Sequence, residues 1–387
     1  MEERKRFIED WLASGGENIA ALCRLYQISR KTGYKWLERF RQGGWPALED
    51  RSHAAQTQPR RIAETLERRV VEARRRHPSW GPKKLRAWLG RREPETFWPA
   101  ASTIGEALKR AGLVSKRRRT RRLAAEPNPL REPQRANELW TIDYKGQFRT
   151  GDGALCYPLT VVDAHSRYLL GCEAHQRPCR QETQPSLEQL FLERGLPERI
   201  RSDNGSPFAS TGAGRLSRLS VWWLKLGIVP ERIEPRKPQQ NGRHERLHRT
   251  LKAETTRPPA ANRGRQQKRF DHFRKEYNEQ RPHEALGQQP PQTAYQQAGR
   301  SYPRKLEDPQ YPGHWERRRV RSDGSVKFRG RTRFLGEALA GELTGWVEAD
   351  EDIWQIWFGP VELAIFDASV GAIWPLGKTV SGPRGGR

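Results

Sequence analysis

The chain has 387 residues, a length that predicts two to four domains rather than one. Its 72 Lys and Arg residues against 46 Asp and Glu give a net charge of +26, which indicates polyanionic partners, because each cation that neutralises a phosphate releases a condensed counterion. No apolar run approaches the length of a membrane span and no two cysteines form a CxxC pair, so we expect neither membrane insertion nor a zinc ribbon, and a cytoplasmic, nucleoid-associated location.

The first part of the chain, residues 1–52, predicts a helix-turn-helix DNA-binding domain. Apolar residues at helical spacing indicate helices over residues 4–12 and 18–26, and Ser29 is the expected N-cap of a third helix. In this motif the N-terminal residues of the third helix meet base edges in the major groove. Here those residues are Arg30, Lys31 and Thr32. The pattern alone is equally compatible with a three-helix packing module whose cations are solvated, and this alternative stays open.

Residues 57–115 predict a second, strongly basic helix-turn-helix domain. Three helices are expected, over residues 61–76, 82–89 and 103–111, with Ser102 as the cap of the last. Residues 57–122 hold 20 Lys and Arg against 6 Glu, a net +14 that is more than half of the chain's surplus. Lys83 and Lys84, at the start of the second helix, are predicted DNA contacts.

A basic and Pro-rich linker is expected over residues 116–136. Its arginines stand in a run without apolar periodicity, a pattern that favours contact with a DNA backbone or minor groove over a packed role. The predicted contacts in this run are Arg117, Arg118 and Arg119.

The remainder of the chain predicts two further domains. Residues 137–298 begin with three β-rich runs and continue with alternating helices and short strands, which is typical of an α/β domain with a mixed sheet. Residues 310–378 show only β runs punctuated by glycine, and we expect a small all-β barrel that binds DNA. The expected fold is therefore multidomain, with helical modules first, an α/β core next and a β barrel last.

Three acidic residues of the α/β segment stand out by their local context. Asp143 lies inside a strand-like run, Asp203 directly follows a short predicted strand, and Glu245 begins a predicted helix. If the two strands are neighbours, the three carboxylates can meet at one point. Mg²⁺ binds one or two carboxylates per ion, and two ions ~4 Å apart clamp the attacking and leaving oxygens of a phosphoryl transfer. On spacing alone each acid could be a cap or a surface charge, and Asp203 before Asn204 and Gly205 could be an Asx-turn residue.

Five sequence blocks around these acids occur in one order. They are Trp140 to Asp143, Leu159 to Tyr168, Arg201 to Phe208, Pro238 to His248 and Tyr277 to Gly287. Together they resemble the catalytic core of retroviral-type integrases, and most closely the DDE transposases of bacterial insertion sequences. The resemblance covers residues 137–292, and the helix-turn-helix patterns and the C-terminal β segment are similar to the flanking domains of the same transposases.

The resemblance implies an RNase H-like fold in which Asp143, Asp203 and Glu245 bind the metal ions. The interval between Asp203 and Glu245 is 41 residues, against the roughly thirty-five typical of the family pattern. The extra length falls around residues 211–220. Glu254 is a rival for the third carboxylate, but it follows the preceding Asn-Gly turn by too long a stretch to match.

Two further roles follow from the resemblance. Asp163 matches a structural acid in the hairpin after the first catalytic strand, which implies a turn residue rather than a ligand. The helix that carries Glu245 is expected to present a cationic face to DNA, because several of its basic residues are spaced one helical turn apart. The predicted contacts are Arg243, His244, His248, Arg249 and Lys252. A solvated charged face is equally compatible for each residue taken singly.

The expected activity is that of a transposase. Two Mg²⁺ ions, for which Mn²⁺ can substitute, would activate water to hydrolyse a phosphodiester at the element's end, and the freed 3′-hydroxyl would then attack target DNA. The helix-turn-helix domains would bind terminal inverted repeats, and pairing two ends requires at least a homodimer. Two alternatives stay open: a non-catalytic, repressor-like helix-turn-helix protein, and a plain RNase H-type nuclease, which would not need two DNA-binding modules.

Overall fold

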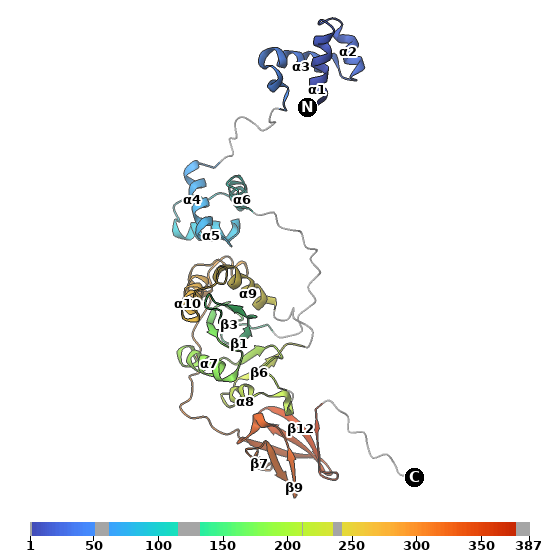
Figure 1. Ribbon diagram of the computed structural model, residues 1–387. Helices are drawn as coiled ribbons and strands as arrows, with labels where there is room; N and C mark the ends of the chain where they lie inside the picture. Colours follow the sequence, from blue (N-terminus) through green and yellow to red (C-terminus); the bar gives the residue numbers. More distant parts are fainter. Residues whose placement is uncertain (1, 51–61, 115–131, 211, 235–241, 377–387) are drawn as a thin grey trace, which may run out of the picture. The chain divides into compact units, whose positions relative to one another are not determined.

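The computed structural model describes residues 2–50, 62–114, 132–210, 212–234 and 242–376 (Figure 1). The chain divides into two compact units, residues 1–61 and residues 62–387. Across the described ranges, no helix combines the length and the apolarity that crossing a membrane requires. The linker predicted over residues 116–136 lies outside the described residues except for its last five positions.

The first unit is a small helical domain, drawn in dark blue in Figure 1. It contains α1 (Glu2–Ala13), α2 (Ile19–Leu25), α3 (Arg30–Gly43) and a 3₁₀ turn (Trp45–Leu48). Ser29 caps α3 as predicted, since its hydroxyl accepts a hydrogen bond from the Thr32 N–H at 3.1 Å. Gly33 lets α2 and α3 pack closely, because a Cβ at this position would stand 2.5 Å from Cys23 Sγ. The predicted pair of helices joined by a tight turn is confirmed.

The second unit begins with three helices around a tryptophan-rich core. They are α4 (Glu64–Arg76), α5 (Pro82–Arg92) and α6 (Ala101–Arg110). Trp80 and Trp98 are buried between them together with Leu85. Helix α6 begins two residues earlier than predicted, at Ala101, so the expected cap Ser102 lies inside the helix.

A six-stranded mixed sheet forms the centre of the second unit. Its strands are β1 (Leu139–Tyr144), β2 (Phe148–Arg149), β3 (Leu155–Asp163), β4 (Leu169–His175), β5 (Arg199–Ser202) and β6 (Val229–Arg232). Strand β3 pairs antiparallel with β1, β2 and β4, whereas β1, β5 and β6 run parallel to one another. The predicted α/β core with a mixed sheet is therefore confirmed.

Helices cover both faces of this sheet. They are α7 (Arg180–Arg194), α8 (Arg218–Lys225), α9 (Gly242–Thr255) and α10 (Arg263–Glu279). Trp140 and Ile142 of β1 pack against α7 and α8, and Val162 of β3 packs against α9 and α10 on the other face. Alternate residues of a strand point to opposite faces. Thr141 and Asp143 therefore point to the α9 side of the sheet.

The last part of the chain is an antiparallel β domain, drawn in orange and red in Figure 1. Its strands are β7 (Glu316–Arg319), β8 (Ser325–Phe328), β9 (Arg331–Phe334), β10 (Leu343–Asp350), β11 (Ile353–Phe358), β12 (Val361–Asp367) and β13 (Ala372–Pro375). Five of them form one sheet in the order β13-β12-β11-β10-β7, and β8 and β9 form a separate hairpin.

The predicted closed barrel is not what these strands form. In the described part of the domain, β7 and β13 are the two edges of the five-stranded sheet and do not pair with each other. The hairpin covers the sheet instead, with Phe328 of β8 stacked on Trp346 at a ring distance of 4.3 Å and edge-on to Phe366 at 5.4 Å. The domain thus closes by aromatic packing rather than by a continuous hydrogen-bond ladder.

The β domain and the α/β core share one hydrophobic cluster. Leu216 and Val221, just before and within α8, are buried together with Leu363 of β12. Gly214 approaches the same strand so closely that a Cβ there would stand 2.9 Å from Leu363 Cδ2. Residues 213–216, within the stretch where the sequence predicts the family's extra length, are therefore part of the surface on which the β domain packs.

Candidate active site

Asp143 and Asp203 stand at the same edge of the sheet. Strands β1 and β5 run parallel, with Thr141 opposite Arg201. Asp143, within β1, comes two residues after Thr141. Asp203, directly after β5, comes two residues after Arg201. The register of the two strands therefore brings these carboxylates together at the carboxyl ends of the strands. Asp203 also makes an Asx turn, since its Oδ1 accepts a hydrogen bond from the Gly205 N–H at 3.0 Å.

Helix α9 brings Glu245 to this edge. The helix is held against the sheet by two buried histidines, His244 and His248, which lie on either side of Glu245 in the sequence. Their Nε2 atoms lie 2.6 Å and 2.7 Å from the hydroxyl oxygen of Thr160, the residue of β3 directly opposite Asp143. Glu245 itself is exposed in the first turn of α9.

Glu254, the rival for the third carboxylate, is engaged elsewhere. It follows Glu245 by nine residues on the same helix, which is about 13 Å along the axis. Its Oε1 accepts a hydrogen bond from Arg281 at 2.8 Å and contacts the hydroxyl of Ser79, just before α5. Glu254 therefore joins α9 to the α4–α6 helices, whereas Glu245 acts electrostatically on Asp143.

The carboxyl group of Asp143 is in an environment that disfavours its charge. Burial above all, then the negative charge of Asp203 and more weakly that of Glu245, raise the pKa of Asp143 from its ordinary 3.8 to about 7. The Tyr144 N–H and the Lys145 cation oppose this rise. The charges of Asp203 and Glu245 therefore both reach Asp143, which the spacing of the three residues in the sequence could not establish.

Replacing Asp143 with Asn should stabilise the metal-free protein at alkaline pH. The pKa of Asp143 is 3.8 in the unfolded chain and about 7 in the folded one, so the wild type loses stability as the pH rises between these values. The loss is on the order of 4 kcal/mol, at about 1.4 kcal/mol per pKa unit. In EDTA, the melting temperature of Asp143→Asn should therefore be several degrees above that of the wild type at pH 8. At pH 4 the two melting temperatures should be nearly equal. Equal shifts at both pH values would contradict this assignment.

The donors at this edge suit a hard divalent cation. Carboxylate oxygens are the ligands that Mg²⁺ and Mn²⁺ prefer, and a cation would relieve the repulsion that raises the pKa of Asp143. The side chains do not yet enclose a common centre: among the described residues, no three His, Cys, Asp or Glu side chains are close enough to hold a metal ion. Binding an ion therefore requires these carboxylates, above all the exposed Glu245, to turn inward.

Models of known families match the same parts of the chain. Two models described as integrase core domain match residues 133–238 and 226–291. A helix-turn-helix domain model matches residues 3–55, and a homeodomain-like domain model matches residues 32–108. This chain contains an integrase core domain preceded by helix-turn-helix domains. The mixed sheet with its flanking helices is thus the RNase H-like sheet that the sequence predicts.

The integrase core has relatives in bacterial insertion elements. The chain is 28% identical over 232 residues to an uncharacterized 31.7 kDa protein of insertion element IS407 from Burkholderia multivorans, across 58% of this chain and 78% of the relative. It is 26% identical over 235 residues to an uncharacterized 39.2 kDa protein of insertion element IS476 from Xanthomonas euvesicatoria, across 60% and 65% of the two chains. A chain from the simian T-cell lymphotropic virus intasome is 16% identical with a TM-score of 0.38, across 72% of this chain and 97% of that chain.

Only part of the cationic face that the sequence predicts on α9 is exposed. His244 and His248 point toward the sheet, and burial lowers their pKa values to about 3 and about 2, so both imidazoles are neutral. The other predicted contacts on this helix are exposed: Arg243, Arg249 and Lys252. Arg243 already pairs with Glu132 at 2.6 Å. Arg243 and Arg249 thus project away from the side of α9 that the two histidines bury, whereas Lys252 follows His248 by one helical turn and is still exposed.

The predicted contacts of the second helical domain face the integrase core. Lys83 Nζ lies 3.1 Å from Glu284 Oε1, and Lys84 donates a hydrogen bond to the carbonyl of Pro282. Burial lowers the pKa of Lys84 to about 8. Lys84 therefore fastens α5 to the loop after α10, whereas Lys83, also a predicted DNA contact, stays exposed beside Glu284.

Of the remaining predicted DNA contacts, the structure describes those on α3 and not those in the linker. Arg30 and Lys31 are exposed in the first turn of α3, and the neighbouring Thr32 takes part in the helix cap through its hydroxyl, 2.9 Å from that of Ser29. The linker contacts lie outside the described residues; they are Arg117, Arg118 and Arg119.

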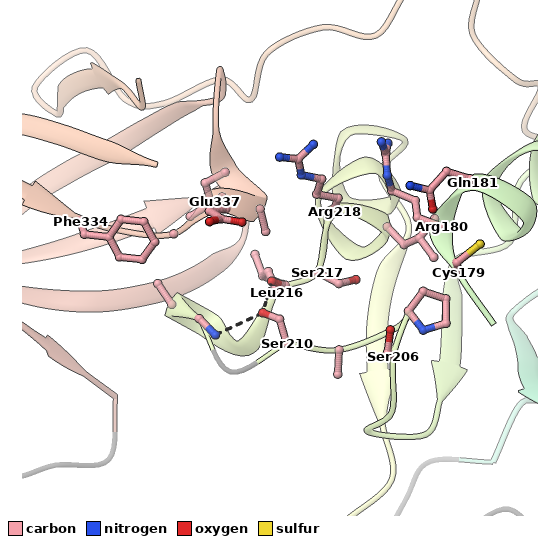
Figure 2. Close-up of a pocket in the computed structure, with 18 residues that line it drawn as sticks. Cys179, Arg180, Gln181, Ser206, Ser210, Leu216, Ser217, Arg218, Phe334 and Glu337 are labelled. Atoms are coloured by element: carbon pink, nitrogen blue, oxygen red, sulfur yellow. Dashed lines mark hydrogen bonds between the residues drawn. The ribbon is translucent and has the colours of Figure 1, made fainter. Parts of the chain in front are cut away.

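A cavity of about 510 Å³ lies beside the loop that follows Asp203 (Figure 2). The start of α7, this loop, the start of α8 and the segment after β9 line it. Arg180 and Arg218 stand on one side of the cavity, and Phe334 and Glu337 of the β domain stand on the other. None of the three carboxylates lines the cavity, so it adjoins the site without containing it.

Sequence reasoning missed the threonines that support the site. Thr160 is fully buried on β3 and contacts both histidines of α9, and Thr141 lies 3.0 Å from His244 Nδ1. The available signal was a hydroxyl residue in the middle of an otherwise apolar strand. Asp163, by contrast, was predicted as a turn residue, and its carboxylate accepts hydrogen bonds from the N–H groups of Ser166 and Asn137, both at 2.7 Å.

Proposed function

We propose that this protein is a transposase that cleaves DNA at the ends of an insertion element and joins those ends to target DNA. The observation that supports the proposal is that the β1–β5 register brings Asp143 and Asp203 to one edge of an integrase-core sheet, where the charge of Glu245 on α9 also acts on Asp143. Helix-turn-helix domains ahead of the core and a net charge of +26 support DNA as the substrate. Relatives encoded by insertion elements support an element's ends as the particular DNA.

The three carboxylates would hold two Mg²⁺ ions, or Mn²⁺ in their place. When bound, such a pair supplies the positive charge that stabilises the attacking and leaving oxygens of an in-line displacement. The chain's own part is positioning: the sheet fixes Asp143 and Asp203, and α9 carries Glu245 to them. Arg249 and Lys252, exposed further along α9, would contact the phosphate backbone of the DNA end.

One site would serve both chemical steps. Water attacks a phosphodiester at the element's end and leaves a 3′-hydroxyl, and this hydroxyl then attacks a phosphodiester of the target strand. Each step exchanges one phosphate ester bond for another bond at the same phosphorus, so no covalent protein–DNA intermediate is needed. The site therefore has to orient two DNA strands in turn rather than provide a protein nucleophile.

Recognition of the ends would fall to the helix-turn-helix domains. Arg30 and Lys31 of α3 would read base edges, and the linker arginines would follow the backbone between the domains. The two ends of an element must be held together for insertion, which requires at least two copies of the chain in the active complex. The partners proposed are therefore element-end DNA, target DNA and a second copy of the protein.

A cleavage assay on supercoiled plasmid that carries an element's ends tests this function. With full-length protein we expect nicked and linear products in Mg²⁺, none in EDTA, and joined products when labelled end DNA is mixed with a target plasmid. Binding without any cleavage would favour the non-catalytic alternative. Cleavage of RNA–DNA hybrids in preference to end DNA would favour the nuclease.

A further inference from the structure

We propose that Thr160, His244 and His248 form a hydrogen-bonded relay that orients Asp143 and fixes the rotation of α9. All three would be positioning residues of the active site. The relay rests on the proposed function only in that Asp143 is taken as an active-site carboxylate.

Thr160 is the centre of the relay. It is directly opposite Asp143 in the antiparallel pairing of β1 and β3, so the two side chains share one face of the sheet. Its side chain is fully buried. The hydroxyl lies 3.2 Å from the main-chain carbonyl oxygen of Asp143, 2.6 Å from His244 Nε2 and 2.7 Å from His248 Nε2. One hydroxyl thus contacts the strand that carries the first carboxylate and the helix that carries the third.

The number of protons restricts how these contacts are made. A threonine hydroxyl donates one hydrogen bond and accepts up to two. When Thr160 donates to the Asp143 carbonyl, both imidazoles must donate from Nε2, and both Nδ1 atoms then carry a lone pair. His244 Nδ1 then accepts from the hydroxyl of Thr141 at 3.0 Å, and the single Thr141 proton makes this shorter contact in place of the one to the Val162 carbonyl at 3.4 Å. In this arrangement every short contact of the relay has one donor and one acceptor.

The Nδ1 lone pair of His248 influences the orientation of the Asp143 carboxylate. His248 Nδ1 lies 3.8 Å from Asp143 Oδ2, too far for a direct hydrogen bond. A nitrogen lone pair beside a carboxylate oxygen repels it, so orientations in which the Asp143 carboxylate moves closer to His248 Nδ1 are disfavoured. The relay therefore limits the orientations that Asp143 can adopt.

The same contacts set the rotation of α9. His244 and His248 are spaced by four residues and are both buried, so together they define which side of the helix faces the sheet. Glu245 is one residue after the first of them, at the border of that side. Removing the Thr160 hydroxyl would leave two buried N–H groups without an acceptor, and α9 would lose the contacts that hold Glu245 at the edge.

Thr160→Val tests the relay because it removes the hydroxyl and keeps the shape of the side chain. In the full-length protein we expect cleavage to fall ~10–100-fold and half-maximal activity to need ~10-fold more Mg²⁺, the effect typical of groups that orient metal ligands. Thr160→Ser should restore both values. The matched control is Thr344→Val in β10, which also removes a fully buried hydroxyl, one that donates to the Arg318 carbonyl at 2.8 Å. The control should lose thermal stability without any change in Mg²⁺ dependence.

A spectroscopic measurement on the metal-free protein tests the relay without activity. Nitrogen-15 spectra of labelled histidines should show His244 and His248 as neutral Nε2–H tautomers, and Thr160→Val should change both signals. His248→Gln, which keeps a donor, should retain Mg²⁺ dependence close to the wild type, whereas His248→Leu should not. Wild-type spectra and wild-type Mg²⁺ dependence in Thr160→Val would overturn the relay. Full activity of Asp143→Asn would instead overturn the proposed function, so the two failures are distinguishable.

Discussion

Substitution of Asp143 or Asp203 with Asn, or of Glu245 with Gln, is expected to reduce DNA strand cleavage below detection while binding to end DNA stays close to wild type. Each change removes the charge of one carboxylate that we propose to hold the metal ions, and leaves the helix-turn-helix surfaces unchanged. Gel analysis of a labelled end fragment in Mg²⁺ measures cleavage, and fluorescence anisotropy with the same fragment in EDTA measures binding. Loss of binding in parallel with cleavage would mean that these variants are misfolded.

Glu254→Gln is the matched control for Glu245→Gln, because both glutamates belong to α9. Glu254 pairs with Arg281 and contacts Ser79, so its loss should lower the melting temperature modestly and leave cleavage largely intact. The opposite result, cleavage that survives in Glu245→Gln and disappears in Glu254→Gln, would show that the third carboxylate is assigned wrongly.

Replacement of Arg30 or Lys31 with Ala should weaken binding to the cognate end by ~1–3 kcal/mol each, or roughly 5–150-fold, and weaken binding to unrelated DNA less. Both side chains are exposed in the first turn of α3, the part of a recognition helix that meets base edges. Arg6, exposed on α1, gives a control cation outside the turn. Competition binding of the full-length variants against cognate and unrelated duplexes, at two salt concentrations, measures the difference.

The linker provides the contrasting case in the same assay. Substitution of Arg117, Arg118 and Arg119 with Ala should weaken binding to the cognate and the unrelated duplex alike, because backbone contacts carry no sequence information. It should also make the binding affinity depend less steeply on salt concentration. Identical behaviour of the linker and Arg30 variants would mean that the first helical domain does not read sequence. The α4–α6 helices would then become the candidate reader.

The central part of the fold could be predicted because local pattern and chemistry agree there. Asp143 in a strand and Asp203 after a strand are positions that sequence periodicity can locate, and their meeting needs only that the two strands be neighbours. The barrel was wrong for a different reason. Short β runs separated by glycines predict strands, but whether the edge strands β7 and β13 pair depends on how far the sheet curls, which no local pattern encodes.

The misplaced DNA contacts have a physical cause as well. Helical spacing groups His244 with His248 on one side of α9, yet it does not say whether that side faces water or the sheet. Lys83 and Lys84 were assigned to DNA because they are cations in a basic segment, and their partners lie about two hundred residues away in the sequence. Charge predicts a need for negative partners, and the chain's own carboxylates and carbonyls can satisfy it.

The hydrophobic cluster shared by α8 and the β domain makes the β domain and the stretch before α8 depend on each other. Leu216, Val221 and Gly214 belong to or adjoin the segment that we expect to lengthen the interval between Asp203 and Glu245, and they pack against Leu363. Without the β domain these apolar groups would be exposed to water. Without the longer interval the β domain would lose the surface on which it packs. We expect the two to be gained and lost as one module, so that relatives with the shorter interval of roughly thirty-five residues lack a β domain packed at this position. A chain cut before the β domain should accordingly aggregate, and its inactivity would report an uncovered core rather than a missing DNA contact.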